Sequence, residues 1–260
     1  MKLYYSLQKP YLSPSLGRIW EGLDLTKPEG AVWVEEERDA DFIFNPVVNY
    51  QDFKNVKLDS RHVLFQLCYL TAGGSPFEWA EIWSKVGLIV SYLDLPWEYL
   101  LMPLGYDPAK FYPEQLPKKY KAMTTGYVDG PGAEYIKAVW EAFGDVIHVG
   151  HDFKFGKGYH NASKLSDNQL RALYSSSEYI VSLRDVEGFE LPLIEGAACG
   201  AIPVALDLPC YKKWFYDTAQ FVSRDNLVED LRNLLPGSPP DVRGFEWANV
   251  MKPLWRTLWT

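Results

Sequence analysis

Short apolar runs alternate with amphipathic segments along most of the chain. Two continuous apolar runs, at 62–69 and 86–92, are typical of strands that a parallel sheet buries on both faces. An aromatic segment at 77–85 lies between them and has the length of a helix. Shorter strands are expected at 2–7, 31–34, 41–44 and 99–102. Strands that alternate with helices in this way predict a doubly wound α/β domain.

The same alternation restarts after a turn-rich stretch that begins at Pro103. Further elements are expected as strands at 122–127, 146–149 and 220–223, helices at 133–143, 166–174 and 225–235, and a polar loop at 150–164. We therefore expect two Rossmann-like domains, residues 1–105 and 106–242, and a helical tail, 243–260, that crosses back to the first domain. Ligands of such sheets bind at the carboxyl ends of the strands, so the two domains would face a central cleft.

The composition is that of a globular protein, with 47% hydrophobic and 23% charged residues. The net charge of −8 argues against a broad phosphate-binding surface, although a local basic groove is compatible with it. The cysteines Cys68, Cys199 and Cys210 lie in or beside apolar runs, and we expect reduced, buried thiols in a cytoplasmic protein. No signal peptide precedes the first strand and no apolar run reaches about 18 residues, so no membrane span is expected.

Aromatic residues are abundant: 10 Trp, 17 Tyr and 13 Phe make up 15% of the chain. Their rings can fill cores and a seam between domains, and they can also stack on the C–H faces of sugars. The sequence leaves both uses open.

Candidate chemistry is concentrated between residues 177 and 213. An apolar strand there leads into the loop V-E-G-F-E, then into a helix, and then into a second apolar strand that is expected to end at Pro209. Pro192 suits the first turn of that helix because proline has no N–H to lose. Free N–H groups at a helix start can hold a diphosphate without cationic side chains, and Gly188 would let the backbone approach the ligand. Glu187 and Glu195 flank this helix start.

Three segments of the chain match patterns that recur together in one enzyme family. They are P-L-G-Y-D-P-A-K-F from Pro103, L-S-D-N-Q-L-R-A-L-Y-S-S-S-E-Y-I-V-S from Leu165, and E-G-F-E-L-P-L-I-E-G-A-A-C-G-A-I-P-V from Glu187. The first resembles the inter-domain linker P-x-G-x-D-x-x-x-F of retaining glycosyltransferases with the GT-B fold, the family that includes sucrose synthase and bacterial mannosyltransferases. The second resembles a helix and strand of that family. The third resembles its signature E-G-F-G-L-P-x-L-E-A-M-A-C-G-x-P-V, with the same spacing between the glutamates.

The resemblance implies a donor site in the second domain. In the family the first signature glutamate, here Glu187, holds the hydroxyls of the donor sugar, and the second, here Glu195, binds the ribose. Arg184 is a candidate catalytic contact to the leaving diphosphate, with an ordinary loop arginine as the alternative. The remaining donor-binding candidates are Gly188, Phe189, Glu190, Leu191, Gly126, Tyr127, His151, Lys154, Gly17 and Arg18. Among these, Glu190 stands where the family has a glycine.

The chain departs from the family where the diphosphate is normally neutralised. The family has an Arg after its strand-end Gly and a Lys further on, whereas Tyr127 stands at the Arg position here and no Lys follows. Because transfer requires stabilisation of the departing phosphates, the positive charge must come from elsewhere. The candidates are Arg184, Lys154, Lys157 and Arg18; for the two lysines, solvated side chains are the slightly favoured interpretation.

Several other polar residues stand near expected strand ends. Gly17 and Arg18 belong to a turn expected at 13–18, before an amphipathic helix at 19–25. The positions that would face the cleft are Asn45, Asn49 and residues 71–75. His148 ends a strand beside the expected nucleotide site, whereas His62 opens a buried strand and is interpreted as structural.

We therefore expect a metal-independent, retaining glycosyltransferase without a cofactor, which moves a hexose from a nucleoside diphosphate sugar such as UDP-glucose. No zinc-ligand spacing, nucleophile elbow or P-loop motif occurs in the sequence. The acceptor is a glycan, a small molecule or, as in phage enzymes, a hydroxymethylated DNA base. The missing cations also suggest an alternative from another class, a non-catalytic protein that binds sugar nucleotides.

Overall fold

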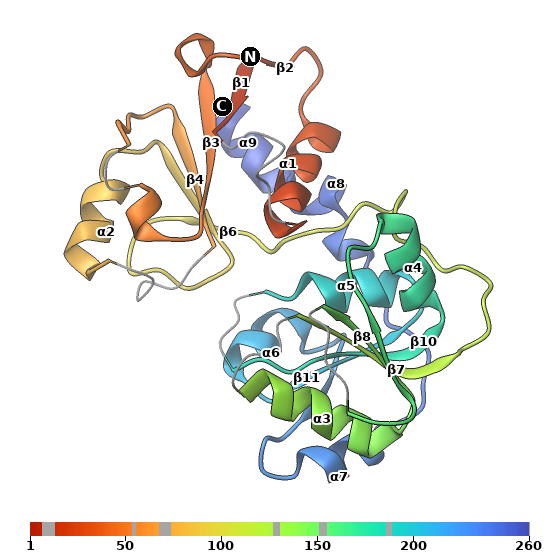
Figure 1. The fold of residues 1–260 in the computed structure, drawn as a ribbon. Coiled ribbons are helices and arrows are strands. Elements are labelled where there is room, and N and C mark those ends of the chain that lie inside the picture. The colour runs from red at the N-terminus through yellow and green to blue at the C-terminus, as the bar shows by residue number, and fades with distance from the viewer. Residues whose placement is uncertain are drawn as a thin grey trace. The chain divides into compact units, whose positions relative to one another are not determined.

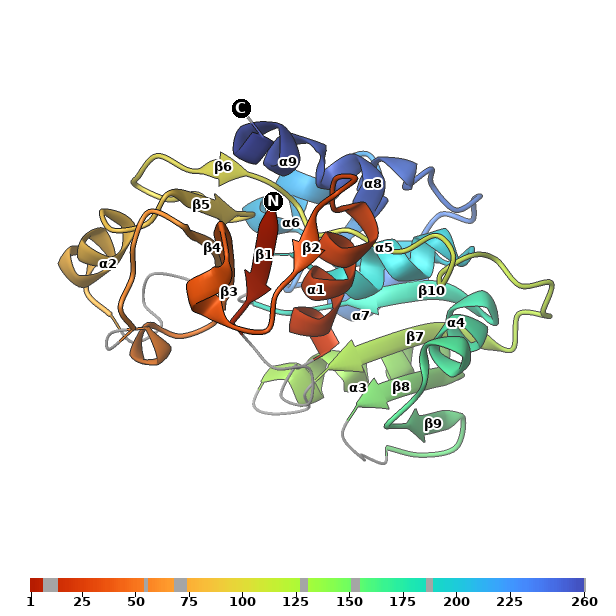
Figure 2. The ribbon, with the colours of Figure 1, turned by 90° about the horizontal axis from the view of Figure 1, so that it is seen from above.

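The computed structural model describes residues 1–6, 14–53, 56–67, 74–126, 131–150, 155–185 and 189–259. The chain divides into two compact units, unit 1 (Met1–Gly105 with Trp247–Thr260) and unit 2 (Tyr106–Glu246). Each unit has a six-stranded sheet in which every pair of neighbouring strands is parallel, with helices packed around it (Figures 1 and 2). This confirms the predicted α/β class. No helix in the described part of the chain is long and apolar enough to cross a membrane.

Unit 1 has the strand order β2-β1-β3-β4-β5-β6. Its elements are β1 (Lys2–Tyr5), α1 (Pro14–Thr26), β2 (Val32–Trp33), η2 (Glu37–Asp39), β3 (Phe42–Val47), η3 (Tyr50–Asp52), β4 (His62–Gln66), α2 (Pro76–Trp83), β5 (Leu88–Ser91), β6 (Leu100–Leu101), α8 (Trp247–Val250) and α9 (Lys252–Trp259). All five residues of β4 are buried, as expected for a strand in the middle of a parallel sheet. The helix α2 begins at a capping box in which Ser75 and Glu78 satisfy each other's backbone N–H groups.

The helices α8 and α9 complete the core of unit 1. Figure 1 shows α8 beside α1, where the ring of Trp247 lies so close to Gly22 that a Cβ at that glycine would collide with it. In α9, Trp255 packs edge-on against Phe44 with ring centroids 5.8 Å apart, and its Nε1 donates to Thr26 Oγ1 at 2.9 Å. The tail therefore crosses back to the first unit, as predicted.

Unit 2 has the strand order β12-β11-β10-β7-β8-β9. Its elements are β7 (Tyr120–Gly126), α3 (Pro131–Phe143), β8 (Val146–Gly150), β9 (Tyr159–Ala162), α4 (Asp167–Ser175), β10 (Ser177–Ser182), α5 (Leu191–Ala198), β11 (Ile202–Leu206), α6 (Pro209–Phe215), β12 (Gln220–Val222), α7 (Leu227–Arg232) and η4 (Arg243–Phe245). Ser166 is the N-cap of α4 and forms a capping box with Gln169, which confirms the predicted start of this helix.

The structure corrects three expectations about local elements. The turn expected at 13–18 is wrong, because α1 already starts at Pro14, a residue compatible with a first helical turn. Within the loop expected at 150–164, Tyr159–Ala162 forms the edge strand β9. Its sequence is too polar to be distinguished from a loop by its hydrophobic pattern. Pro209 does not simply close β11; it opens the short helix α6.

Neither of the two described cysteines, Cys199 and Cys210, forms a disulfide, and they differ in burial. Cys199 is buried, and burial together with the nearby Glu195 raises the pKa of its thiol to about 12. Cys210 is only half-buried, so the expectation of a buried thiol is wrong there. Cys68 lies outside the described residues.

Candidate functional site

In the sheet of unit 2, the order in which successive strands are added reverses between β7 and β10. From β7 the chain adds β8 and β9 on one side and then crosses over to add β10, β11 and β12 on the other. In doubly wound sheets, ligands bind at the carboxyl ends of the strands beside this switch point. Here β7 ends at Gly126, and β10 ends at Ser182, two residues before Arg184. Two of the predicted site residues, Gly126 and Arg184, therefore meet at the switch point.

Gly126 and Arg184 are packed against each other. Gly126 has a φ of 110°, a conformation that side chains disfavour, and a Cβ built on it would collide with the guanidinium group of Arg184. The glycine thus provides the space in which the arginine side chain crosses the end of β7. Arg184 retains 36% of its side-chain exposure. Its positive charge is therefore presented at the ligand-binding edge of the sheet.

Glu190 fixes the other side of Arg184. Its Oε1 lies 3.3 Å from Arg184 Nε, and only 3% of the glutamate side chain is exposed. A buried carboxylate of this kind needs a charged or hydrogen-bonding partner. Glu190 is also the N-cap residue of α5, at the positive end of that helix. The glutamate that replaces the family's glycine therefore forms an ion pair with the arginine at the switch point.

A small cavity of about 30 Å³ lies beside Arg184. It is lined by Thr124 and Thr125 of β7, by the residues that end β10, and by the first turns of α3, including Tyr135. This volume is close to that of one water molecule. Because Ile136, Val139, Val181 and Leu183 also line it, the cavity is a small, largely apolar notch next to the guanidinium group, and it does not by itself enclose a ligand.

Asp185, the residue after Arg184, joins three segments of unit 2. Tyr135 Oη donates to Asp185 Oδ1 at 2.6 Å, and Arg224 Nη2 lies 2.7 Å from the same oxygen. Burial, assisted by the bond to Asp185, raises the pKa of Tyr135 to about 12. These contacts anchor the backbone that positions Arg184. Neither Tyr135 nor Arg224 belongs to a recognisable sequence motif, so the sequence gives no signal for their contacts with Asp185.

Glu195 is the fifth residue of α5 and is 4% exposed. Its Oε2 accepts a hydrogen bond of 3.3 Å from the phenol of Tyr174, a residue of α4 that is 1% exposed. A buried carboxylate with a phenol donor is a preorganised acceptor for hydroxyl groups. The ribose role of Glu195 stays a prediction, now with Tyr174 as the residue that orients it.

Phe189 and Leu191 have buried side chains. The ring centroid of Phe189 lies 5.0 Å from that of Phe215 and 5.8 Å from that of Phe245. Phe189 thus belongs to an aromatic cluster with residues of α6 and η4. Because both side chains are buried, any contact of Phe189 or Leu191 with a donor would come from their backbone.

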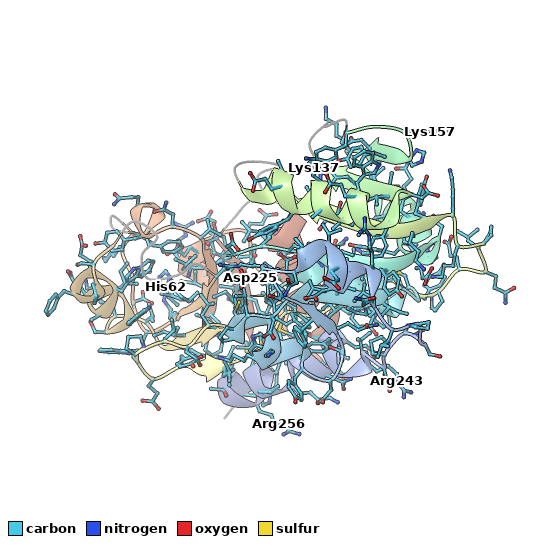
Figure 3. All side chains as sticks on the ribbon, turned by 90° about the horizontal axis from the view of Figure 1, so that it is seen from below. His62, Lys137, Lys157, Asp225, Arg243 and Arg256 are labelled. Atoms are coloured by element: carbon cyan, nitrogen blue, oxygen red, sulfur yellow. The ribbon has the colours of Figure 1, made fainter. Side chains whose placement is uncertain are left out.

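Five of the predicted site residues lie outside the described part of the chain. Glu187 and Gly188 fall in 186–188, and Tyr127, His151 and Lys154 fall in 127–130 and 151–154, all outside the described residues. Lys157 is exposed on unit 2 (Figure 3). Gly17 and Arg18 belong to unit 1, where they lie in α1 and not in a loop; Arg18 Nη1 is 3.1 Å from Glu21 Oε2.

Both described histidines of the sheet interiors have structural surroundings. His62 is fully buried, as Figure 3 shows it within unit 1, and its Nδ1 lies 2.9 Å from Asn45 Nδ2. Burial lowers the pKa of its imidazole, so His62 is neutral near pH 7. His148 is also fully buried, with its Nδ1 2.9 Å from Thr124 Oγ1. The structural interpretation of His62 therefore agrees with its surroundings, and His148 has the same character.

Asn49 has a local structural role, since its side chain caps η3 by accepting from the N–H of Gln51. Among the described residues, no group of three or more His, Cys, Asp or Glu side chains is arranged to hold a metal ion.

Neither a family model nor a curated protein matches the chain. Solved structures do match. AviGT4, a glycosyltransferase involved in avilamycin A biosynthesis, aligns over 99% of this chain and 97% of its own, with a TM-score of 0.61 and 13% identity. The fold is GT-B.

Other GT-B structures align over most of this chain. An alpha-glucosyltransferase, solved with UDP and a 13-mer DNA, covers 99% of this chain and 94% of its own at a TM-score of 0.58 and 10% identity. Sucrose-phosphate synthase from Thermosynechococcus elongatus aligns over 86% of this chain and 75% of its own, with a TM-score of 0.56 and 14% identity. At such low identity the likeness establishes the GT-B fold, and the chemistry has to be argued from the residues of this chain.

Proposed function

We propose that this protein transfers a hexose from a nucleoside diphosphate sugar, UDP-glucose or a similar UDP-hexose, to a hydroxyl group of an acceptor. The observation on which this depends is Arg184, which lies at the switch point of unit 2, over Gly126 and against Glu190. A cation there supplies the charge that the family's usual Arg and Lys would otherwise give to the diphosphate. The GT-B fold, and the UDP or UDP-glucose bound in similar structures, support the choice of donor.

The proposed roles divide the donor among three side chains. Arg184 stabilises the departing diphosphate, Glu195 binds the ribose hydroxyls beside Tyr174, and Glu187 holds the hydroxyls of the sugar. In the reaction the bond between the anomeric carbon and the β-phosphate oxygen breaks, and its electron pair leaves with UDP. The acceptor oxygen bonds to the anomeric carbon, and its proton passes to the departing phosphate. Attack from the side of the leaving group would retain the anomeric configuration.

Glu190 acts through Arg184 in this proposal and is a positioning residue. Charge stabilisation in a transition state depends on groups that are held in place before the reaction, because reorganisation then costs little. A glycine at position 190, as in the family, would leave the arginine without this anchor. The Arg184–Glu190 pair is therefore a substitute for the family's cations that lies on a different strand.

The acceptor has two candidates. A glycan or small metabolite is the first. A DNA base is the second, because alpha-glucosyltransferases solved with DNA have similar structures. The sequence of unit 1 contains 11 Lys and Arg against 14 Asp and Glu, a net −3, whereas DNA affinity comes mainly from cationic contacts to phosphates. The charge balance therefore favours the first candidate.

Donor turnover tests the proposal. The protein would be screened by thermal unfolding against UDP, GDP, ADP and their glucose conjugates, since a ligand that binds the native state raises Tm. UDP release from UDP-glucose would then be measured with glycan acceptors and with DNA containing hydroxymethylated bases. Stabilisation by UDP-glucose with acceptor-dependent UDP release supports a transferase. Stabilisation without UDP release, whatever the acceptor, would instead support a protein that only binds sugar nucleotides.

A further inference from the structure

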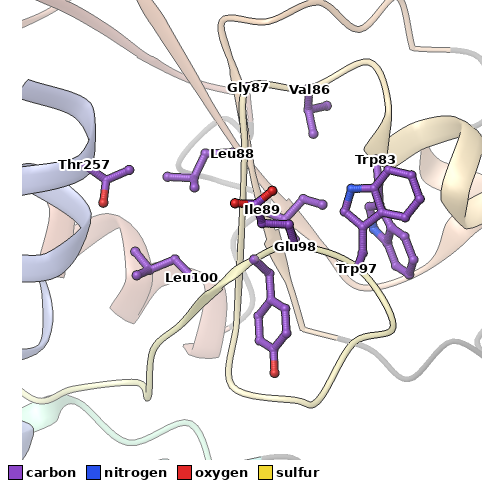
Figure 4. A pocket seen from close by; sticks show the side chains of 10 residues that line it. Trp83, Val86, Gly87, Leu88, Ile89, Trp97, Glu98, Leu100 and Thr257 are labelled. Carbon is purple, nitrogen blue, oxygen red and sulfur yellow. The ribbon is translucent and has the colours of Figure 1, made fainter. Parts of the chain in front are cut away.

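Unit 1 contains a pocket of about 490 Å³ (Figure 4). Its walls come from the end of α2, the start of β5, the segment that precedes β6, and α9. The lining side chains that matter for its chemistry are Trp83, Trp97, Glu98, Tyr99 and Leu100. The volume lies within the range of small-molecule sites, roughly 300–1,000 Å³.

The pocket lies at the edge of the sheet where β5 and β6 begin. Gly87 and Leu88, at the start of β5, line it, and the pairing of Val90 with Leu100 places residues 97–99 beside this start. Ligands of doubly wound sheets normally bind at the opposite edge, at the carboxyl ends of the strands. The pocket is therefore separate from the sites that the fold itself implies.

Trp83 and Trp97 line the pocket, and Trp79 supports Trp83 from behind. Trp79 and Trp83 are stacked, with ring centroids 6.1 Å apart and an angle of 22° between the rings, and both are buried. The ring of Trp97 packs at a tilt against that of Trp83, with a centroid distance of 5.9 Å, and Trp97 is 42% exposed. A large ring held from behind by other rings loses little conformational entropy when a ligand covers it. The exposed indole is thus a preorganised platform.

The polar groups of the pocket distinguish among ligands. The indole Nε1 of Trp83 is buried and has no hydrogen-bond partner among the described residues, which costs roughly 1–3 kcal/mol if no ligand or water satisfies it. Glu98 adds an exposed carboxylate, an acceptor of hydroxyl protons. No Lys or Arg is among the residues that line the pocket. This chemistry disfavours phosphates and nucleotides and suits an uncharged ligand with both a C–H face and hydroxyl groups.

We propose that this pocket binds a neutral hexopyranose unit of an oligosaccharide, stacked on Trp97, with its hydroxyl groups bonded to Glu98 and to the indole N–H of Trp83. This binding site is proposed from the aromatic and polar residues that line the pocket, and it does not require the proposed transfer reaction. If both hold, the pocket is an anchor for a glycan acceptor on unit 1, the unit that does not contain the proposed donor-binding residues.

Binding of three uncharged trisaccharides, maltotriose, cellotriose and chitotriose, tests this site in the full chain. Saturation-transfer NMR and tryptophan fluorescence would give the Kd of each. We expect millimolar binding of at least one probe, and a roughly tenfold higher Kd for Trp97→Ala, which corresponds to about 1.4 kcal/mol. Glu98→Gln should raise the Kd about threefold, since it removes one charge-assisted acceptor.

Trp259→Ala is the matched control, because Trp259 is an exposed tryptophan of the same unit, 55% exposed, that does not line the pocket. Its Kd should equal that of the parent protein. Saturating UDP should also leave the Kd unchanged. Trp97 and Glu98 are exposed, so their variants should unfold at nearly the parent temperature.

Four results would overturn the proposal. They are the absence of binding for every probe, equal binding by Trp97→Ala, displacement of the trisaccharide by UDP, and a Trp97-dependent self-association that excludes the sugar. The last would identify the pocket as an interface between copies of this chain. UDP release is measured separately, so failure of this site and failure of the proposed transfer reaction are distinguishable.

Discussion

The ion pair between Arg184 and Glu190 predicts an asymmetric response to mutation. Arg184→Ala leaves the carboxylate of Glu190, a side chain with 3% exposure, without its cation. Breaking a buried ion pair in this way costs about 3–5 kcal/mol. We expect about 2 kcal/mol here, because Arg184 is already partly solvated and the N-terminus of α5 continues to favour the negative charge. For a chain of this size that corresponds to a fall in Tm of roughly 4–8 °C.

Glu190→Gln should have a much smaller effect on stability. Arg184 is 36% exposed, so water can hydrate its guanidinium group when the charge of Glu190 is removed, while the amide keeps the shape of the glutamate. We expect a change of less than about 1 kcal/mol. Its effect on catalysis should be larger: kcat falls about tenfold through loss of positioning, and Arg184→Ala lowers kcat by about 10²–10³, as for the removal of a transition-state donor.

Thermal unfolding and UDP release from UDP-glucose measure these two effects. The matched control is Arg243→Ala, since Arg243 pairs with Asp241 on the surface of unit 2 and is 78% exposed (Figure 3). It should change neither Tm nor kcat. Equal destabilisation by Glu190→Gln and Arg184→Ala would contradict the asymmetry of the ion pair. Turnover of UDP-glucose at the parent rate by Arg184→Ala would exclude Arg184 from catalysis.

Three further predictions concern residues around the donor site. Glu195→Ala should weaken UDP binding at least tenfold by calorimetry, and an unchanged UDP affinity would remove the ribose role. Glu187→Gln should reduce turnover of UDP-glucose far more than UDP affinity; parent turnover in this variant would exclude Glu187 from the sugar site. Tyr135 has a folded pKa of about 12 against 10.0 unfolded, so its contribution to stability is complete below pH 10 and is lost as the pH rises towards 12. Tyr135→Phe should therefore lose less stability than the parent between pH 10 and 12 in alkaline unfolding, and equal losses would contradict the assignment.

The α/β class could be predicted from the sequence because continuous apolar runs of strand length are typical of central strands in a parallel sheet. All residues of β4 are buried, and the capping serine of α4 lies where its sequence pattern places it. The edge strand β9 escaped prediction because Y-H-N-A has no apolar face, and its structure depends on pairing with β8. The start of α1 was missed because Pro14 and Gly17 are typical of turns, and tertiary packing of the helix overrides that local preference.

At the candidate site, residue types were easier to predict than their partners. Arg184 was identified from its distance to the signature glutamate, but its contacts with Gly126 and Glu190 depend on the register of β7 against β10. The sequence marked Glu190 only as a departure from a pattern. An ion pair between a strand end and a helix start has no characteristic sequence separation, because the length of the loop that connects the two elements can vary. A single sequence therefore does not reveal such a pair.

The packing of α8 and α9 in unit 1 has a consequence for the order of folding. Trp247 and Trp255 complete a core whose other members, Gly22, Thr26 and Phe44, precede unit 2 in the chain. During synthesis, domains generally fold from the N-terminus onwards. Unit 1 cannot follow that order, since part of its core emerges from the ribosome only after all of unit 2. A nascent chain would then contain a folded unit 2 and an incomplete unit 1. Unit 1 would therefore become resistant to proteolysis after unit 2, although most of it is synthesised first.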